Sequence, residues 1–228
     1  MKPKLIERPR NFIVSLKKYG IWKTLQVSYS FFVDCWFDRK YQVDTLAFVE
    51  LVDMDIEEEK KPHSSKYQPT QGLPLRKLFK RLNFPPGMVF VDLGCGKGRV
   101  LLIASEFGFK EVIGVEHSLF LCKIAAENCK KYQQRQKTKT EFTICHSDVR
   151  DYPFKDEEKV FFLYNPFDAS IMQSVLESIL SSLRRRNRKI WILSQTAVHR
   201  QLIETVLTPR KVSSLTLRGL DFVVFEIG

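Results

Sequence analysis

The chain has 228 residues, of which 44% are hydrophobic, so it can bury a core that offsets the entropy lost on folding. This length fits one large domain, or one domain with an appendage, and argues against two full domains. Lysine and arginine number 37 and aspartate and glutamate 26, which gives a formal net charge of +11. The positive excess favours acidic or phosphate-bearing partners but identifies no ligand.

Cysteine usage and hydropathy indicate a cytoplasmic protein. The five cysteines, an odd number without a C-x-x-C pair, are Cys35, Cys95, Cys122, Cys129 and Cys145. They suggest neither a disulfide framework nor a zinc site, and the histidines lack metal-ligand spacing, so we expect no metal. No stretch approaches the roughly 18 apolar residues of a membrane span. Charges occupy the start of the chain, where a signal peptide needs its apolar block.

The first 70 residues differ from the rest. Residues 11–37 carry large apolar side chains at helical spacing with basic residues between them, which indicates a helix packed against a main domain. The alternative is a basic amphipathic element that makes a peripheral contact with an anionic membrane or docks a partner. Residues 53–70 have the composition of an exposed linker, and residues 73–82 predict a helix. We therefore expect a helical N-terminal extension and linker at 1–70 and a main domain at 71–228.

From residue 88 onward, apolar runs of strand length alternate with amphipathic stretches of helix length. The predicted strands are 88–94, 111–117, 140–148, 159–167, 188–195, 211–218 and 219–228, with helices at 97–107, 118–134, 168–184 and 198–207. The run 159–167 is almost without polar residues and should be central. A tight turn at Arg218–Gly219 makes the last two strands an antiparallel hairpin. The pattern predicts an α/β fold with a doubly wound, mostly parallel seven-stranded sheet and an antiparallel last strand.

The turn after the first strand reads V-D-L-G-C-G-K-G-R, residues 91–99, and carries Asp92, Gly94, Gly96 and Gly98. Its glycines allow backbone to approach a ligand closely. A P-loop needs Ser or Thr after the lysine, whereas Gly98 follows Lys97. A dinucleotide site is disfavoured because Asp92 would repel a pyrophosphate by about 4 kcal/mol at ~4 Å. S-adenosylmethionine carries two cationic groups and no phosphate, so the same carboxylate would attract it.

Two further acidic residues follow the next two strands. Glu116 ends the second strand, where a carboxylate can accept both hydroxyls of a ribose. Asp148 ends the third, where its carboxylate can accept the adenine amino group while the Val149 N–H meets a ring nitrogen. With Asp92, these groups should line one crevice at the carboxyl ends of three successive strands. The alternative for Glu116 and Asp148 is capping of the helices that follow.

Residues 87–168 resemble class I S-adenosylmethionine-dependent methyltransferases. The glycine turn corresponds to the first motif of that family, Glu116 and Asp148 to its second and third acidic positions, and Y-N-P-F (164–167) to its fourth motif. The segments F-D-R-K-Y-Q-V-D-T (37–45) and K-Y-Q-P-T (66–70) resemble bacterial methyltransferases of unassigned substrate. The resemblance implies S-adenosylmethionine as the methyl donor. It also implies that Tyr67 closes over the methionine end of the donor, although a linker tyrosine that packs locally is the alternative.

The fourth motif resembles the N-P-P-Y of amino-methylating relatives. In those enzymes the Asn carbonyl and the next backbone carbonyl accept hydrogen bonds from the acceptor NH2, and the aromatic ring stacks on a planar group. The resemblance assigns these catalytic roles to Asn165, Pro166 and Phe167. This chain lacks the second proline and has Phe for Tyr, which favours a lysine-type amine over a planar amide or nucleobase. An ordinary Asn-Pro turn and a core Phe167 are the alternatives.

The sequence thus predicts a methyltransferase that methylates an amine nitrogen on a protein or another macromolecule. RNA, DNA or a small molecule is the alternative acceptor. A function of a different kind is a non-catalytic nucleic-acid-binding module that uses the basic runs 130–139 and 183–189 to follow phosphates. Those runs can equally be solvated helix ends, where cations suit the helix dipole.

Overall fold

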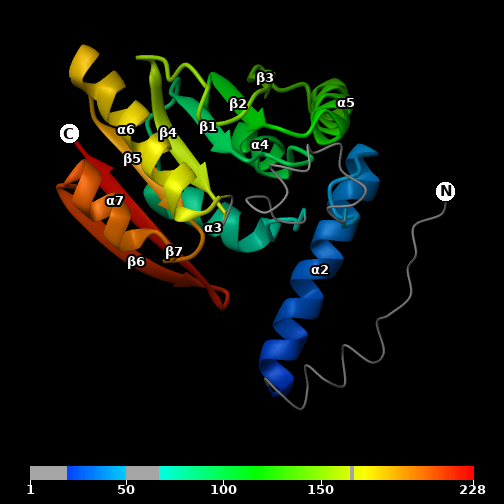
Figure 1. The fold of residues 1–228 in the computed structure, drawn as a ribbon. Coiled ribbons are helices and arrows are strands. Elements are labelled where there is room, and N and C mark those ends of the chain that lie inside the picture. Colours follow the sequence, from blue (N-terminus) through cyan, green and yellow to red (C-terminus); the bar gives the residue numbers. More distant parts are fainter. Residues whose placement is uncertain (1–19, 50–66, 165–166) are drawn as a thin grey trace.

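The computed structural model describes residues 20–49, 67–164 and 167–228. Its seven strands form one sheet in the order β3-β2-β1-β4-β5-β7-β6 (Figure 1). The strands are β1 Val89–Leu93, β2 Glu111–Glu116, β3 Glu141–His146, β4 Glu158–Leu163, β5 Ile190–Ser194, β6 Lys211–Leu217 and β7 Leu220–Ile227. The first five are parallel, and β7 runs antiparallel to both β5 and β6. The predicted doubly wound sheet is confirmed, with β4 at its centre.

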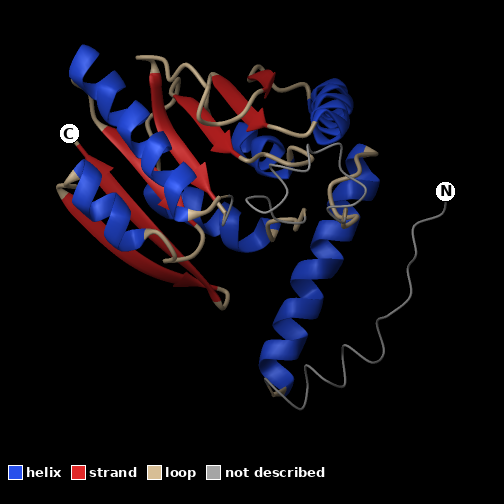
Figure 2. Ribbon diagram, in the orientation of Figure 1, coloured by secondary structure: helices blue, strands red, loops and turns tan. Residues whose placement is uncertain are grey.

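Helices cover both faces of the sheet (Figure 2). The helices are α2 Ile21–Tyr41, α3 Gly72–Leu82, α4 Arg99–Ala104, α5 Leu119–Gln136, α6 Ala169–Arg185 and α7 Arg200–Leu207, with a short 3-10 turn at Ser105–Phe107. Successive strand residues point to opposite faces. Phe90 and Phe162 therefore join the core beneath α3, α4 and α5, while Val91 and Phe161 join the core beneath α6 and α7.

Local signals fix several element boundaries as predicted. The Ser118 hydroxyl accepts a hydrogen bond from the Leu121 N–H and caps α5, and the Asp168 carboxylate caps α6. Arg218 and Gly219 have φ of 52° and 79°, which suits a tight hairpin turn. β4 ends at Leu163, four residues earlier than predicted, because its neighbours β1 and β5 end at the same level.

Helix α2 lies beside the domain, and its N-terminal half extends away from the sheet (Figure 1). A stripe of buried residues, Ser30, Asp34, Phe37 and Tyr41, faces the domain. The Tyr41 and Tyr132 ring centroids are 4.6 Å apart, so α2 packs on α5 as the helical prediction expected. Residues 11–19 and most of the predicted linker lie outside the described part of the chain. Within that part, no helix is long and apolar enough to cross a membrane.

A buried arginine joins α2 to the main domain. The Arg99 Nη2 atom lies 2.5 Å from Asp34 Oδ1, and Nη1 lies 3.1 Å from Asp38 Oδ1. Arg99 Nε also donates to the Thr70 carbonyl oxygen at 2.9 Å. Buried charges are tolerated when they are paired and hydrogen-bonded. Arg99 therefore fixes α2 and the chain at Thr70 to the start of α4.

We expect Arg99→Ala to lower the free energy of unfolding by about 3–5 kcal/mol, because it leaves Asp34 and Asp38 buried without their cation. Urea unfolding at neutral pH measures the loss. Lys131→Ala is the matched control, since its ion pair with Glu127 is largely exposed and should contribute at most ~0.5 kcal/mol. Equal small losses in both variants would contradict a structural role for Arg99.

Candidate active site

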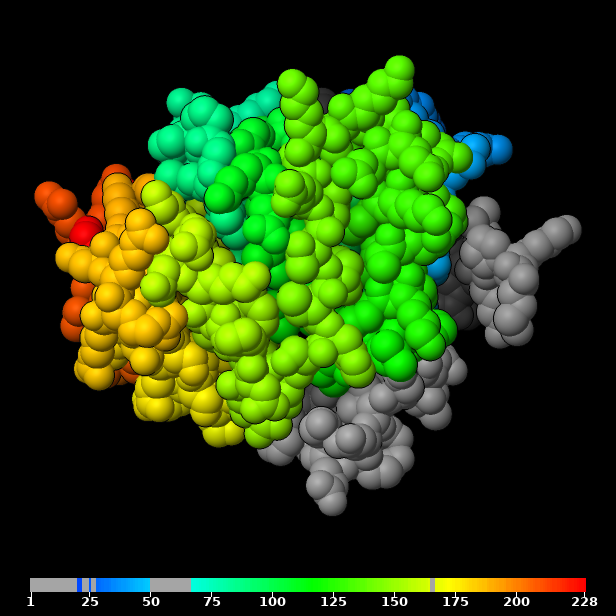
Figure 3. Space-filling view, turned by 90° about the horizontal axis from the view of Figure 1, so that it is seen from above, coloured from blue at the N-terminus to red at the C-terminus, as the bar shows by residue number. Residues whose placement is uncertain are grey.

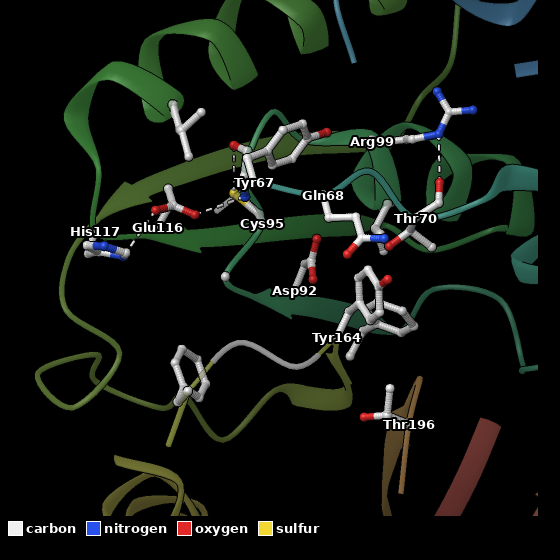
Figure 4. Close-up of a pocket in the computed structure, with 16 residues that line it drawn as sticks. Tyr67, Gln68, Thr70, Asp92, Cys95, Arg99, Glu116, His117, Tyr164 and Thr196 are labelled. Carbon is white, nitrogen blue, oxygen red and sulfur yellow. Dashed lines mark hydrogen bonds and ion pairs between the residues drawn. The ribbon is translucent and has the colours of Figure 1, made fainter. Parts of the chain in front are cut away.

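A cavity of about 240 Å³ opens at the carboxyl ends of the parallel strands. Its walls come from the ends of β1, β2, β4 and β5 and from residues 67–70 (Figure 4). Seen from above, the yellow-to-orange surface, which includes residues of α6, lies beside the green surface, which includes residues of α5 (Figure 3). The crevice outside the carboxyl ends of parallel strands is the usual ligand position in this class of sheet.

The glycine turn forms one wall of this cavity. The Gly94 and Cys95 N–H groups both donate to the Val115 carbonyl oxygen, at 2.9 and 3.1 Å, which fixes the turn against β2. Gly96 has φ of 53°, and a Cβ there would lie 2.3 Å from the Tyr67 ring. Gly98 stands behind the cavity, where a Cβ would lie 3.3 Å from Ala125 on α5. The structure thus brings Gly94 and Gly96 to the cavity and gives Gly98 a packing role.

Asp92 lies at the floor of the cavity and is only 3% exposed. Burial raises the pKa of Asp92 well above its usual range, and the charge of Glu116 raises it further. Among the described residues, no lysine or arginine forms an ion pair with Asp92. In Figure 4 the Asp92 carboxylate lies between Glu116 on one side and Tyr164 on the other. Two acidic groups enclosed in this way favour a cationic ligand over an anionic one.

Glu116 is buried at the end of β2. Its Oε2 atom accepts a hydrogen bond from the Gly96 N–H at 2.9 Å, and Oε1 accepts one from the Ser118 N–H at 3.0 Å. His117 Nδ1 lies 3.2 Å from the same Oε1 atom. Each carboxylate oxygen has a second lone pair, so Glu116 can still accept a ligand hydroxyl. The sequence did not show that Glu116 also holds the glycine turn in place.

The third acidic position does not reach the cavity. The Asp148 carboxylate accepts hydrogen bonds from Arg150 Nε and Nη2 at 3.0 and 2.7 Å, and from the Arg150 N–H at 2.9 Å. Val149 is buried in the core beneath α6. Neither residue lines the cavity. The adenine role of Asp148 and Val149 therefore stays a prediction from the sequence.

Tyr67 reaches the cavity from the N-terminal side of α3. Its hydroxyl donates to the Thr45 carbonyl oxygen at 2.8 Å, and its ring covers Gly96. Burial raises the pKa of the Tyr67 hydroxyl, so the side chain stays neutral. Gln68 and Thr70, which sequence reasoning missed, line the same wall. The sequence signal that could have found Gln68 and Thr70 was their position beside Tyr67 in the segment K-Y-Q-P-T.

The end of β4 and the chain after it contribute aromatic residues to the cavity, and this part of its wall is here called the aromatic end. Asn165 and Pro166 lie outside the described residues, while Phe167 lines the cavity together with Phe162 and Tyr164. His199 Nε2 lies 3.0 Å from the Phe167 carbonyl oxygen, which fixes the chain after β4 to the start of α7. Thr196 also lines this end and has φ of 137°, a strained backbone region for a residue other than glycine. The sequence carries no signal for Thr196, because a β-branched residue does not predict a positive φ.

The arrangement resembles known methyltransferases in sequence and in fold. The family described as "Histone methylation protein DOT1" matches residues 63–218. No curated protein matches the chain. One similar solved structure is the methyltransferase domain of bacterial CtHen1, with 15% identity, a TM-score of 0.54, and coverage of 69% of this chain and 98% of that one. Another is an S-adenosylmethionine-dependent methyltransferase from Aquifex aeolicus, with 15% identity, a TM-score of 0.51, and coverage of 68% and 89%.

A third similar structure is the tRNA (uracil-54, C5)-methyltransferase of Pyrococcus abyssi with S-adenosyl-L-homocysteine, at 14% identity and a TM-score of 0.49. The match covers 71% of this chain and 40% of that enzyme, so the chain spans less than half its length. Identities this low show a shared fold and nothing about substrates. The DOT1 match, in contrast, covers more than half of the sequence. The chain therefore belongs to the DOT1 family and is a class I S-adenosylmethionine-dependent methyltransferase.

Proposed function

We propose that the protein transfers the methyl group of S-adenosylmethionine to an amine nitrogen on a protein or another macromolecule. The observation that carries the donor half of this proposal is the buried pair Asp92 and Glu116 at the ends of two adjacent strands. The donor has a sulfonium and an amino group, both cationic, so it relieves the repulsion between these carboxylates. A phosphate-bearing coenzyme would increase that repulsion.

The donor would lie across the strand ends. Asp92 and the turn 94–98 would hold its methionine portion, and Glu116 would accept hydrogen bonds from its ribose. Tyr67, whose ring covers Gly96, would close over the methionine end. This assignment is supported by the lining of one cavity, which includes Asp92, Glu116, Gly94 and Gly96. The residues present therefore fit the donor.

The adenine portion is the least defined part of the assignment. Asp148 and the Val149 N–H remain our proposal for adenine recognition from the sequence alone. Because Arg150 occupies the Asp148 carboxylate, the adenine amino group would have to share that carboxylate or displace Arg150. We therefore expect Asp148 to contribute less to donor binding than Asp92 or Glu116.

The acceptor would enter at the aromatic end. An amine on an aliphatic stem suits walls made by Phe162, Tyr164 and Phe167, because the stem packs on the rings and a cationic amine is attracted to their faces. The amine reacts after it has lost its proton. Its lone pair then forms the N–C bond while the C–S bond breaks, which leaves a methylammonium product and S-adenosylhomocysteine. Alignment of the nitrogen, the methyl carbon and sulfur is the main requirement.

A protein acceptor is favoured over nucleic acid. The family description refers to methylation of a histone, which is a protein. The basic run 183–189 is also partly neutralised within the structure, since Arg185 pairs with Asp156 at 3.0 Å and Lys189 with Glu226 at 2.9 Å. Such pairs reduce the charge that would follow a phosphate backbone. The remaining positive balance favours an acceptor with acidic surface groups.

Labelling of cell extract with methyl-radiolabelled donor tests the acceptor class. We expect the incorporated label to resist nuclease and to be released by protease, because the acceptor is an amine of a protein. Amino-acid analysis of the digest should then find methylated lysine. Label that nuclease releases would identify RNA or DNA instead. Heat-inactivated enzyme supplies the background value.

Replacement of Asn165 tests the acceptor end. We expect Asn165→Ala to lower kcat on the order of 100-fold, since it removes a carbonyl that stabilises the developing positive charge on nitrogen. Donor affinity by calorimetry should remain near that of the wild type. Gln173→Ala on the exposed side of α6 is the control and should change neither quantity. Equal losses of kcat and donor affinity would mean that Asn165 supports the fold.

Replacement of Asp92 tests its proposed role at the donor site, first through the pH dependence of the protein's stability. The raised pKa of Asp92 means that the folded state retains a proton that the unfolded state releases near pH 4. The Asp92 contribution to stability therefore falls as the pH rises from about 4 through the raised pKa. Asp92→Asn removes this fall, so its Tm should exceed that of the wild type at pH 8, with a smaller difference at pH 4.5.

The same variant should bind the donor more weakly by about 1.5–3 kcal/mol, the usual contribution of hydrogen bonds to a charged group. Wild-type donor affinity should rise with pH as Asp92 ionises, and the variant should lose that dependence. Glu116→Ala gives a contrast, because it removes the acceptor for two backbone N–H groups and should lower both Tm and affinity. An Asp92→Asn variant with unchanged affinity would refute the donor assignment.

A further inference from the structure

A strap from the N-terminal extension, residues 43–49, lies against the glycine turn. The Asp44 N–H donates to Asn128 Oδ1 at 2.9 Å, and the Asp44 carbonyl oxygen accepts from Asn128 Nδ2 at 2.9 Å. The same Nδ2 atom donates to the Lys97 carbonyl oxygen at 3.0 Å. Asn128, buried on α5, therefore joins the strap to the turn with three hydrogen bonds.

Lys97 makes a second connection between the strap and the turn. Its side chain is only 2% exposed, and its Nζ atom lies 2.9 Å from Asp44 Oδ2. The same Nζ atom lies 5.7 Å from the centroid of the Tyr67 ring. A buried ammonium is stable when it is paired, and Asp44 is its ion-pair partner within the described part of the chain. The ammonium thus lies between the carboxylate of the strap and the tyrosine ring.

The strap in turn holds Tyr67. The Tyr67 hydroxyl donates to the Thr45 carbonyl oxygen at 2.8 Å, and its N–H donates to the Val49 carbonyl oxygen at 3.2 Å. Its ring covers Gly96 at the wall of the cavity (Figure 4). Tyr67 is therefore fixed from the strap at its hydroxyl and at its backbone, and from the turn through Lys97.

We infer that Asp44, Lys97 and Asn128 form a clasp that positions Tyr67 and the glycine turn for donor binding, so that the N-terminal extension sets donor affinity. The inference rests on the proposed function, because it concerns the same cavity. These three are positioning residues, since none of them lines the cavity. The Asp44 side chain is 57% exposed, but the Lys97 side chain is only 2% exposed, so loss of the Asp44 carboxylate leaves a buried ammonium unpaired and lowers stability as well as acting on the cavity wall.

Asp44→Ala removes the carboxylate from this ion pair. We expect its dissociation constant for S-adenosylmethionine, measured by calorimetry, to rise about fivefold, a typical coupling between two sites. The KM for the donor should rise with it, while kcat at saturating donor stays near the wild-type value. The Tm without donor should fall, because the buried Lys97 ammonium loses its ion-pair partner. Asp44→Glu, which retains the carboxylate, should restore most of the affinity.

Lys97 variants test the other side of the clasp. Lys97→Arg keeps the charge and should bind the donor more tightly than Lys97→Met. Combining Asp44→Ala with Lys97→Met should add little to the effect of Lys97→Met alone, because both remove one ion pair. Glu127→Ala is the control on the exposed side of α5 and should leave donor affinity unchanged. Additive losses of affinity would overturn the clasp.

Hydrogen exchange provides a readout that does not depend on activity. Donor should slow the exchange of amides in residues 43–49 of the wild type, because coupling between ligand and clasp is reciprocal, and this slowing should be smaller in Asp44→Ala. Failure of the wild type to bind donor would refute the proposed function. Normal donor binding by the wild type and equally by Asp44→Ala would refute the clasp alone. A loss of Tm in Asp44→Ala that Asp44→Glu does not restore would assign Asp44 to the fold instead.

Discussion

Two carboxylates buried side by side impose the main constraint on this protein. A parallel sheet brings the ends of β1 and β2 together, so Asp92 and Glu116 share one cavity. Backbone N–H groups of Gly96 and Ser118 stabilise the Glu116 carboxylate, whereas burial and the charge of Glu116 oppose ionisation of Asp92. The folded protein therefore carries an electrostatic cost at Asp92, which a cationic donor bound as we propose would relieve. On that proposal, stability is reduced at the position where binding energy would be gained.

The glycine turn is also where the N-terminal extension is anchored. Lys97 and Arg99, two residues apart, both point away from solvent and pair with carboxylates of the extension. Arg99 binds α2 through two aspartates, and Lys97 binds the strap through Asp44. A segment that precedes the sheet in the chain is thereby fixed at the wall of the donor cavity. The extension belongs to the site, although the sequence pattern presents it as an appendage.

Periodicity predicted the sheet because central strands such as β1, β4 and β5 are buried on both faces and read as apolar runs, whereas the edge strands β3 and β6 are only partly buried. Capping residues such as Ser118 and Asp168 were also visible, since a cap depends on neighbours within a few residues. Contacts between distant segments leave no pattern in the sequence. The ion pair between Lys97 and Asp44, which are 53 residues apart, was therefore not predicted. Asp148 illustrates a different case. Its position in the sequence matches the family, while in the structure Arg150, only two residues later, pairs with its carboxylate and Asp148 does not line the cavity, so its adenine role stays a prediction.

The net charge of the whole chain and the charges inside the cavity have opposite signs and act over different distances. Across the whole chain the balance is +11, while the cavity contains buried acids. Salt screens charges beyond about 8 Å, so an approaching macromolecule responds to the nearest surface groups and not to the total. Ion pairs such as Arg185–Asp156 and Lys189–Glu226 remove part of the positive field near α6 and β5. In the site that we propose, the donor would meet the acids only after it enters the cavity, where low dielectric strengthens their attraction. Donor selection would then be local, whereas acceptor selection would depend on the surface around the aromatic end.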